Sequence, residues 1–163
     1  MLGGTPLHQA CWSGRLDEIP ARIFTDIYLM AKDPLGCTPL HYAARCGHLD
    51  KLPSSALLGR YMLQVDNDRG ETPLHLAAKN GHFNQVPAEL ITENNLLLKN
   101  IFGQTVLHYL VKFNDADRVL GIKLPNKTRK IVGEAWWSKN QEIMKNRLEL
   151  VDVPDPDAGI DLF

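Results

Sequence analysis

Two absences restrict the class of protein to which this chain can belong: it has few cysteines and no long apolar run. Its three cysteines, Cys11, Cys37 and Cys46, show no paired spacing, which argues against a disulfide framework and for a reducing compartment. No stretch of about 18 apolar residues is present to span a bilayer. The N-terminus lacks the basic and apolar regions of a signal peptide. We therefore expect a cytoplasmic protein with no membrane partner.

The sequence also lacks the motifs of common catalytic and metal sites. It contains no phosphate-binding glycine loop, no nucleophile elbow and no paired metal ligands. Its formal net charge of -1 provides no general attraction to nucleic acid or to a membrane. We therefore expect a protein that is not an enzyme and that holds neither a cofactor nor a metal. An enzyme built on a reactive cysteine is the weakest alternative.

Against these absences, one six-residue motif occurs four times. Thr-Pro-Leu-His-x-Ala, or a close variant, stands at residues 5–10, 38–43, 72–77 and 105–110. Successive copies are 33, 34 and 33 residues apart. Glycines recur in step, two residues before each threonine and again after three of the copies: Gly3, Gly36, Gly70 and Gly103, then Gly14, Gly47 and Gly81. A fixed period of this length indicates a protein built from stacked repeats.

Each position of the motif has a physical role. Threonine caps a helix N-terminus through its side-chain oxygen, and proline at the next position starts the helix without losing a hydrogen bond. Leucine and alanine form a slim apolar face that allows neighbouring helices to approach closely. The glycine before the motif permits the positive φ of a tight turn, and the glycine after it ends the helix. The motif therefore predicts one short helix in each repeat.

The motif and its period resemble those of the ankyrin repeat family. The resemblance implies an all-α solenoid of antiparallel helix pairs, joined by projecting loops of the β-hairpin type. It divides the chain into four repeats, at residues 1–33, 34–66, 67–100 and 101–122. The fourth copy has Val106 in place of proline and Leu110 in place of alanine, so we expect it to be the last repeat stacked.

The second half of the repeat departs from the family pattern. Pro20, Pro53 and Pro87 each follow their motif threonine by 15 residues, where a second helix is expected. A proline inside a helix costs about 3 kcal/mol, so we predict that this helix starts late, near the proline. A further capped turn is predicted at residues 92–95. We interpret the departure as a structural variation without functional meaning.

Histidines and cysteines recur within the repeats. Four histidines share one register: His8, His41, His75 and His108. Successive repeats lie about 10 Å apart, too far for two imidazoles to share a zinc ion. The family resemblance implies instead that these histidines are structural and hydrogen-bond the loop of the adjacent repeat. It also implies that Cys11 is packed, whereas Cys37 and Cys46 fall on exposed positions where a reactive thiol stays an alternative.

The family binds other proteins through its loop tips and through the exposed face of the first helix. By register, the tips are Leu35, Arg69 and Phe102. The first-helix row is Trp12, Arg45, Lys79 and Lys112, with Phe113 beside its end. Tryptophan and arginine are enriched in binding hot spots, and this row holds three cations. We therefore predict a monomeric, non-catalytic scaffold whose protein partner is acidic or mixed acidic-apolar, with a merely solvated basic face as the alternative.

Beyond the repeats the sequence changes character twice. Residues 123–151 are basic and include a helix predicted from about residue 134 to 150, which would cover the open end of the solenoid. Residues 152–163 are acidic and rich in turn residues. The last five residues resemble a bacterial sliding-clamp-binding peptide, with three apolar side chains that either dock to a partner or pack back on the solenoid: Ile160, Leu162 and Phe163. These features leave a nucleic-acid-associated adaptor as the alternative function.

Overall fold

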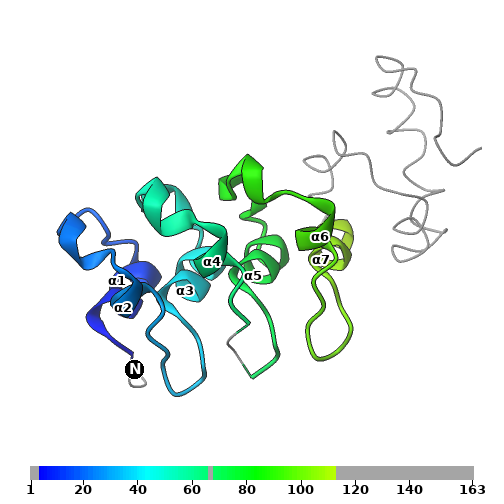
Figure 1. Cartoon of the computed structure of the whole chain (residues 1–163), viewed down its shortest axis with the longest axis horizontal. Coiled ribbons are helices and arrows are strands. Elements are labelled where there is room, and N and C mark those ends of the chain that lie inside the picture. Colours follow the sequence, from blue (N-terminus) through cyan, green and yellow to red (C-terminus); the bar gives the residue numbers. More distant parts are fainter. Residues whose placement is uncertain (1–3, 66–67, 113–163) are drawn as a thin grey trace, which may run out of the picture.

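The computed structural model describes residues 4–65 and 68–112. Within them, four repeats stack in a row, and each begins with a helix at the motif (Figure 1). These first helices are α1 (Pro6–Ser13), α3 (Pro39–Cys46), α5 (Pro73–Lys79) and α7 (Val106–Lys112). Each packs against the next along the row. The predicted all-α solenoid is confirmed for these residues.

The core runs along the row of first helices. The motif leucines are at most 2 % exposed: Leu7, Leu40, Leu74 and Leu107. The alanines of α3 and α5 are fully buried: Ala43, Ala44, Ala77 and Ala78. Burying a leucine side chain contributes about 1.5–3 kcal/mol, and alanine allows the backbones to approach closely. The slim apolar face predicted from the motif is therefore the contact between repeats.

The motif residues begin and end the first helices as predicted. Thr38 lies in extended backbone before α3, and its N–H donates to Nδ1 of His41 at 3.1 Å. Histidine thus takes the place that glutamate holds in the usual capping box. Pro39 occupies the first turn of α3, and Gly47 ends the helix with φ of 76°. This left-handed backbone is strained for any residue that carries a Cβ, which explains the glycine.

The second half of each described repeat is broken at its proline, as predicted. Pro20, Pro53 and Pro87 have φ of -60°, -62° and -56° and each directly precedes a 3₁₀ turn. One turn of α-helix then follows: η1 (Ala21–Ile23) and α2 (Asp26–Leu29), η3 (Ser54–Leu57) and α4 (Gly59–Met62), η5 (Ala88–Leu90) and α6 (Glu93–Leu96). In two repeats another 3₁₀ turn comes before the proline: η2 (Leu49–Lys51) and η4 (Phe83–Gln85). The capped turn predicted at residues 92–95 is α6, where Oγ1 of Thr92 accepts the Asn95 N–H at 3.3 Å.

The loops between repeats project from one side of the stack, as Figure 1 shows at the bottom. The described residues contain no strand and one isolated antiparallel bridge, at the base of the last loop. The first loop is closed by a backbone bond from the Asp33 N–H to the Cys37 carbonyl oxygen at 3.0 Å and by the Asp33 side chain, whose Oδ1 accepts the N–H groups of Leu35 and Cys37, both at 2.9 Å. Asn100 closes the last loop in the same way. These side-chain bonds pair backbone donors that a strand ladder would otherwise satisfy.

Several predictions concern parts of the chain outside the described residues. They are the basic segment 123–151 with its helix, the acidic tail 152–163, and five side chains: Lys112, Phe113, Ile160, Leu162 and Phe163. The backbone of Lys112 ends α7. Within the described residues, none of the helices has the length and apolar character needed to cross a lipid bilayer.

Candidate partner-binding surface

The motif histidines link each repeat to the loop of the next. Because Nδ1 of His41 accepts the Thr38 N–H, the ring proton lies on Nε2, which donates to the Glu71 carbonyl oxygen at 3.0 Å. The equivalent bonds of His8 and His75 measure 3.0 and 2.8 Å. Burial lowers the pKa of His75, which favours this neutral form. The structural interpretation of these three histidines is confirmed.

The cysteines of the first helices are not activated as nucleophiles. Cys11 is fully buried, and burial together with nearby Cys46 raises its pKa to about 12. Burial also raises the pKa of Cys46, although Arg45 acts in the opposite direction. The family register implied that Cys37 and Cys46 are exposed, but both are partly buried. Because the thiolate is the reactive form, Cys11 and Cys46 are poorly suited to catalysis at neutral pH.

The first two members of the predicted row lie on α1 and α3. Trp12 is exposed, and its indole ring stacks on the phenol ring of Tyr42, with 6.2 Å between centroids and 25° between planes. Arg45 is also exposed. No carboxylate in residues 4–65 and 68–112 lies within ion-pair distance of its guanidinium group. The side chains of Trp12 and Arg45 are therefore accessible to a binding partner.

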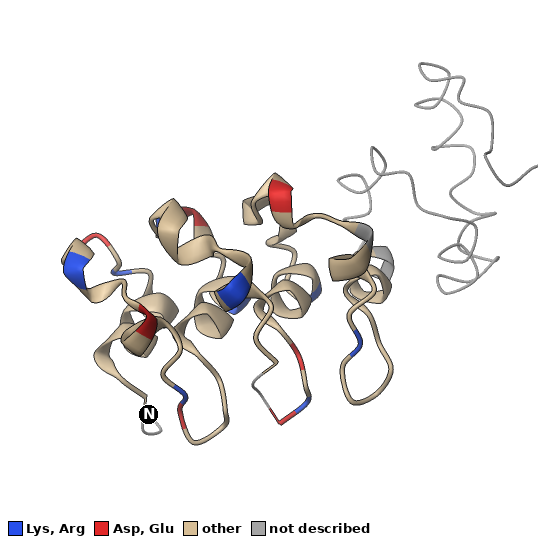
Figure 2. Cartoon of the chain, viewed as in Figure 1, with Lys and Arg blue, Asp and Glu red and all other residues tan. Residues whose placement is uncertain are grey.

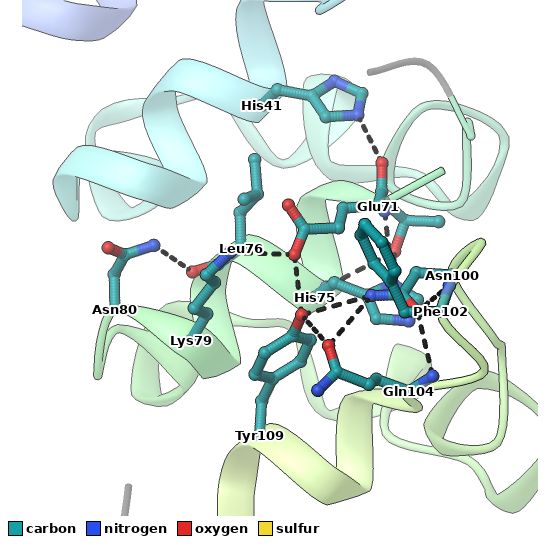
Figure 3. A network of polar contacts seen from close by, with 11 residues as sticks. His41, Glu71, His75, Leu76, Lys79, Asn80, Asn100, Phe102, Gln104 and Tyr109 are labelled. Atoms are coloured by element: carbon teal, nitrogen blue, oxygen red, sulfur yellow. Dashed lines mark hydrogen bonds and ion pairs between the residues drawn. The ribbon is translucent and has the colours of Figure 1, made fainter. Parts of the chain in front are cut away.

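Lys79, the third member of the row, forms an ion pair with another residue of the chain (Figure 3). Its Nζ lies 3.0 Å from Oε1 of Glu71, whose side chain is 2 % exposed, and 5.5 Å from the ring centroid of Tyr109. The Tyr109 hydroxyl donates to the same carboxylate oxygen at 2.8 Å. Burial, followed by this hydrogen bond, raises the pKa of Tyr109 to about 12. The charge of Lys79 is thus compensated within the fold, unlike that of Arg45.

The described tip residues are exposed, as predicted from register. Leu35 and Phe102 present apolar side chains, and Arg69 lies at the tip of the loop between them. Ile101, which the sequence analysis missed, is exposed beside Phe102, and its N–H donates to the Arg69 carbonyl oxygen at 3.1 Å. Register identifies only one tip residue in each loop. It therefore could not predict that the neighbouring Ile101 is exposed or that its backbone N–H bonds the preceding loop.

Two adjoining grooves lie between the first helices and the loops. The first has a volume of about 480 Å³ and is lined by Trp12, Leu35, Tyr42 and Arg45, among others. The second, of about 230 Å³, shares the last three of these residues and continues to Lys79 on α5. We call the surface formed by these grooves and the exposed loop tips the concave face. The grooves are lined by five of the six predicted site residues whose side chains the structure describes, and Phe102 lines neither groove.

Tyr42 is a residue of this face that the sequence analysis missed. Its hydroxyl donates to Oδ2 of Asp33 at 2.5 Å. Burial, followed by this hydrogen bond, holds the pKa of Tyr42 well above its ordinary value. Tyr42 therefore stays protonated and connects α3 to the first loop. A signal existed, because the variable position of the motif is tyrosine in both the second and the fourth repeat.

Comparison with protein families agrees with this geometry. A model described as ankyrin repeats (3 copies) matches residues 54–123, and a model of a single ankyrin repeat matches residues 35–54. Together they cover more than half of the chain. The chain belongs to the ankyrin repeat family. Ankyrin repeats generally mediate protein–protein interactions and are generally non-catalytic. A comparison with curated protein sequences finds no match.

Proposed function

We propose that this ankyrin repeat chain is a non-catalytic interaction module that binds a partner protein across its concave face. The loop tips and the row of first helices form the two sides of the binding surface. This arrangement leaves the stacking contacts between repeats intact when a partner is bound. The proposal includes action as a monomer in the cytoplasm, which fits cysteines that are free rather than paired.

The observation that carries the proposal is the exposure of large apolar side chains on this face. Trp12, Leu35 and Phe102 are 52 %, 43 % and 65 % exposed. Trp12 and Leu35 line the same groove, whereas the exposed apolar residues at α2, such as Ile27, line neither groove. Exposed apolar side chains that share a groove mark interaction sites more often than scattered ones do. Tryptophan is also among the residues most enriched in binding hot spots. A partner that covers this face would remove these side chains from water.

The charges of the concave face favour an acidic or mixed acidic-apolar partner. Arg45 supplies an exposed cation beside the apolar groove. Over the described repeats, Lys and Arg are interspersed with Asp and Glu rather than gathered in a stripe (Figure 2). Nucleic-acid binding depends on clustered cations that replace the counterions of the phosphates. The described repeats therefore favour a protein partner over nucleic acid.

An affinity capture from cells of the source organism tests the proposal. Wild-type chain is compared with Trp12→Ala and Phe102→Ser, after far-UV circular dichroism has shown that each variant is folded. Ile27→Ser is the matched control, because Ile27 is an exposed apolar residue of α2 that lines neither groove. We expect a partner that wild type and Ile27→Ser retain and the other variants lose. Equal capture by all four proteins would contradict binding at this face.

A further inference from the structure

Equivalent positions in different repeats carry different residues, so the effect of each residue can be compared within one chain. Tyr42 and Tyr109 hold the same position of the motif in the second and fourth repeats. Each ring is contacted by the residue seven positions after the motif threonine of the preceding repeat. That residue is Trp12 beside Tyr42, and Lys79 beside Tyr109. The same backbone frame therefore presents an aromatic pair at one end and a cation on an aromatic ring at the other.

The two ends also differ in their carboxylates. In the third repeat, Glu71 directly precedes the motif threonine and neutralises Lys79. In the second repeat, the equivalent residue is Cys37, so Arg45 has no carboxylate at the position that serves Lys79. The cation of the third repeat is satisfied within the fold, whereas the cation of the second repeat is left for a group from outside.

Asp33 is the carboxylate that lines the first groove, and it accepts three hydrogen bonds within the fold. Its Oδ1 accepts two backbone N–H groups, and its Oδ2 accepts the Tyr42 hydroxyl. The residue is 7 % exposed. The groove thus combines an apolar wall of Trp12, Leu35 and Tyr42 with one exposed guanidinium group, that of Arg45.

We propose that this first groove is the specificity pocket of the concave face, and that it takes an apolar side chain with a carboxylate beside it. The inference rests on the proposed function and narrows it to one part of the surface. The apolar side chain packs on Trp12 and Leu35, and the carboxylate forms a two-pronged ion pair with Arg45. Arginine suits this role because its planar guanidinium group matches the two oxygens of a carboxylate. The occupant is an acidic-apolar segment of a partner protein.

The test is a selection of displayed random dodecapeptides on the full-length chain, followed by fluorescence polarisation with the enriched peptides. Each peptide is titrated against wild type, Trp12→Ala, Arg45→Gln and Phe102→Ser. Arg22→Gln is the charge-matched control, because Arg22 lies on η1 and lines neither groove. We expect enriched peptides to carry an apolar residue next to Asp or Glu. We also expect Trp12→Ala and Arg45→Gln to weaken their binding by about tenfold or more, with Arg22→Gln unchanged.

The outcomes separate this inference from the broader proposal. If no peptide is enriched, or if enriched peptides lack an acidic residue, the specificity pocket is wrong. If Phe102→Ser weakens binding while Trp12→Ala and Arg45→Gln do not, the pocket is wrong but the concave face stays the binding surface. If none of these three substitutions changes binding, both proposals fail. Replacing the acidic residue of a peptide by its amide must also weaken binding to wild type but not to Arg45→Gln.

Discussion

Replacing Gly14 by alanine tests the contact that joins the first repeat to the second. Gly14 ends α1 with φ of 72°, and a Cβ built on it lies 2.7 Å from Nε2 of His48. The His48 ring is held in place, because its Nδ1 is hydrogen-bonded to the Cys11 carbonyl oxygen at 2.9 Å. The substitution therefore imposes left-handed strain on the backbone and displaces a bonded ring.

The two costs can be separated within the same chain. Left-handed backbone costs a residue with a Cβ about 1–2 kcal/mol. Loss of the bond between His48 and Cys11 adds about 0.5–1.5 kcal/mol. Gly81→Ala is the matched control, because Gly81 has φ of 77° and no atom within 4 Å of its built Cβ. We expect Gly81→Ala to show only the strain, and Gly14→Ala to reach about 1.5–3.5 kcal/mol.

Urea unfolding followed by far-UV circular dichroism measures these differences. His48→Ala and the double variant Gly14→Ala/His48→Ala complete the cycle. With the imidazole ring removed, alanine at position 14 should cost no more than alanine at position 81. If Gly14→Ala and Gly81→Ala destabilise the wild-type chain equally, a Cβ at position 14 does not displace His48 and the reasoning fails.

Further predictions concern the buried residues. Leu74→Ala should lower the free energy of unfolding by about 2–5 kcal/mol in calorimetry, because Leu74 is 1 % exposed between neighbouring repeats. Glu71→Ala should cost about 1–3 kcal/mol in urea unfolding, since it removes the charged acceptor of the Lys79 ammonium and leaves the Tyr109 hydroxyl with Oε1 of Gln104 as its remaining acceptor. The pKa of His75 is lowered in the fold, so its contribution is complete above the unfolded pKa of about 6.5 and is lost as pH falls through the folded value. Urea midpoints should therefore fall on acidification, and His75→Gln should reduce that dependence. Alkylation of Cys11 by iodoacetamide at neutral pH should be far slower than that of a free thiol, as its pKa of about 12 requires.

The bounds of the first helix in each repeat were predictable, because the residues that set them act within that helix. Thr38, Pro39 and Gly47 act within one helix, so their spacing alone predicts where α3 begins and ends. Pro53 acts locally as well, and its fixed φ predicts the break in the second helix. The closure of the loops was not predictable from the motif. It depends on Asp33, a residue outside the motif whose side chain competes with a strand ladder for the same N–H groups.

The candidate site was predictable in position but not in charge. Register places Arg45 and Lys79 on one face, because they follow their motif threonines at the same distance. Whether each cation is free to bind a partner protein depends on a second residue, which is Glu71 in the third repeat and Cys37 in the second. Register states which side chains share a face, whereas ion pairs depend on contacts between residues that do not belong to the motif. The difference between the two cations therefore required the structure.

The proline breaks and the candidate binding surface lie on different layers of the solenoid. Both grooves are lined by residues of the first helices and the loops, none of which belongs to the turns that follow Pro20, Pro53 and Pro87. Those turns cover the other side of the first helices, where they bury side chains such as Leu29, Met62 and Leu96. This separation supports the interpretation that the broken second helix is structural, and that specificity resides in the residues around Trp12 and Arg45.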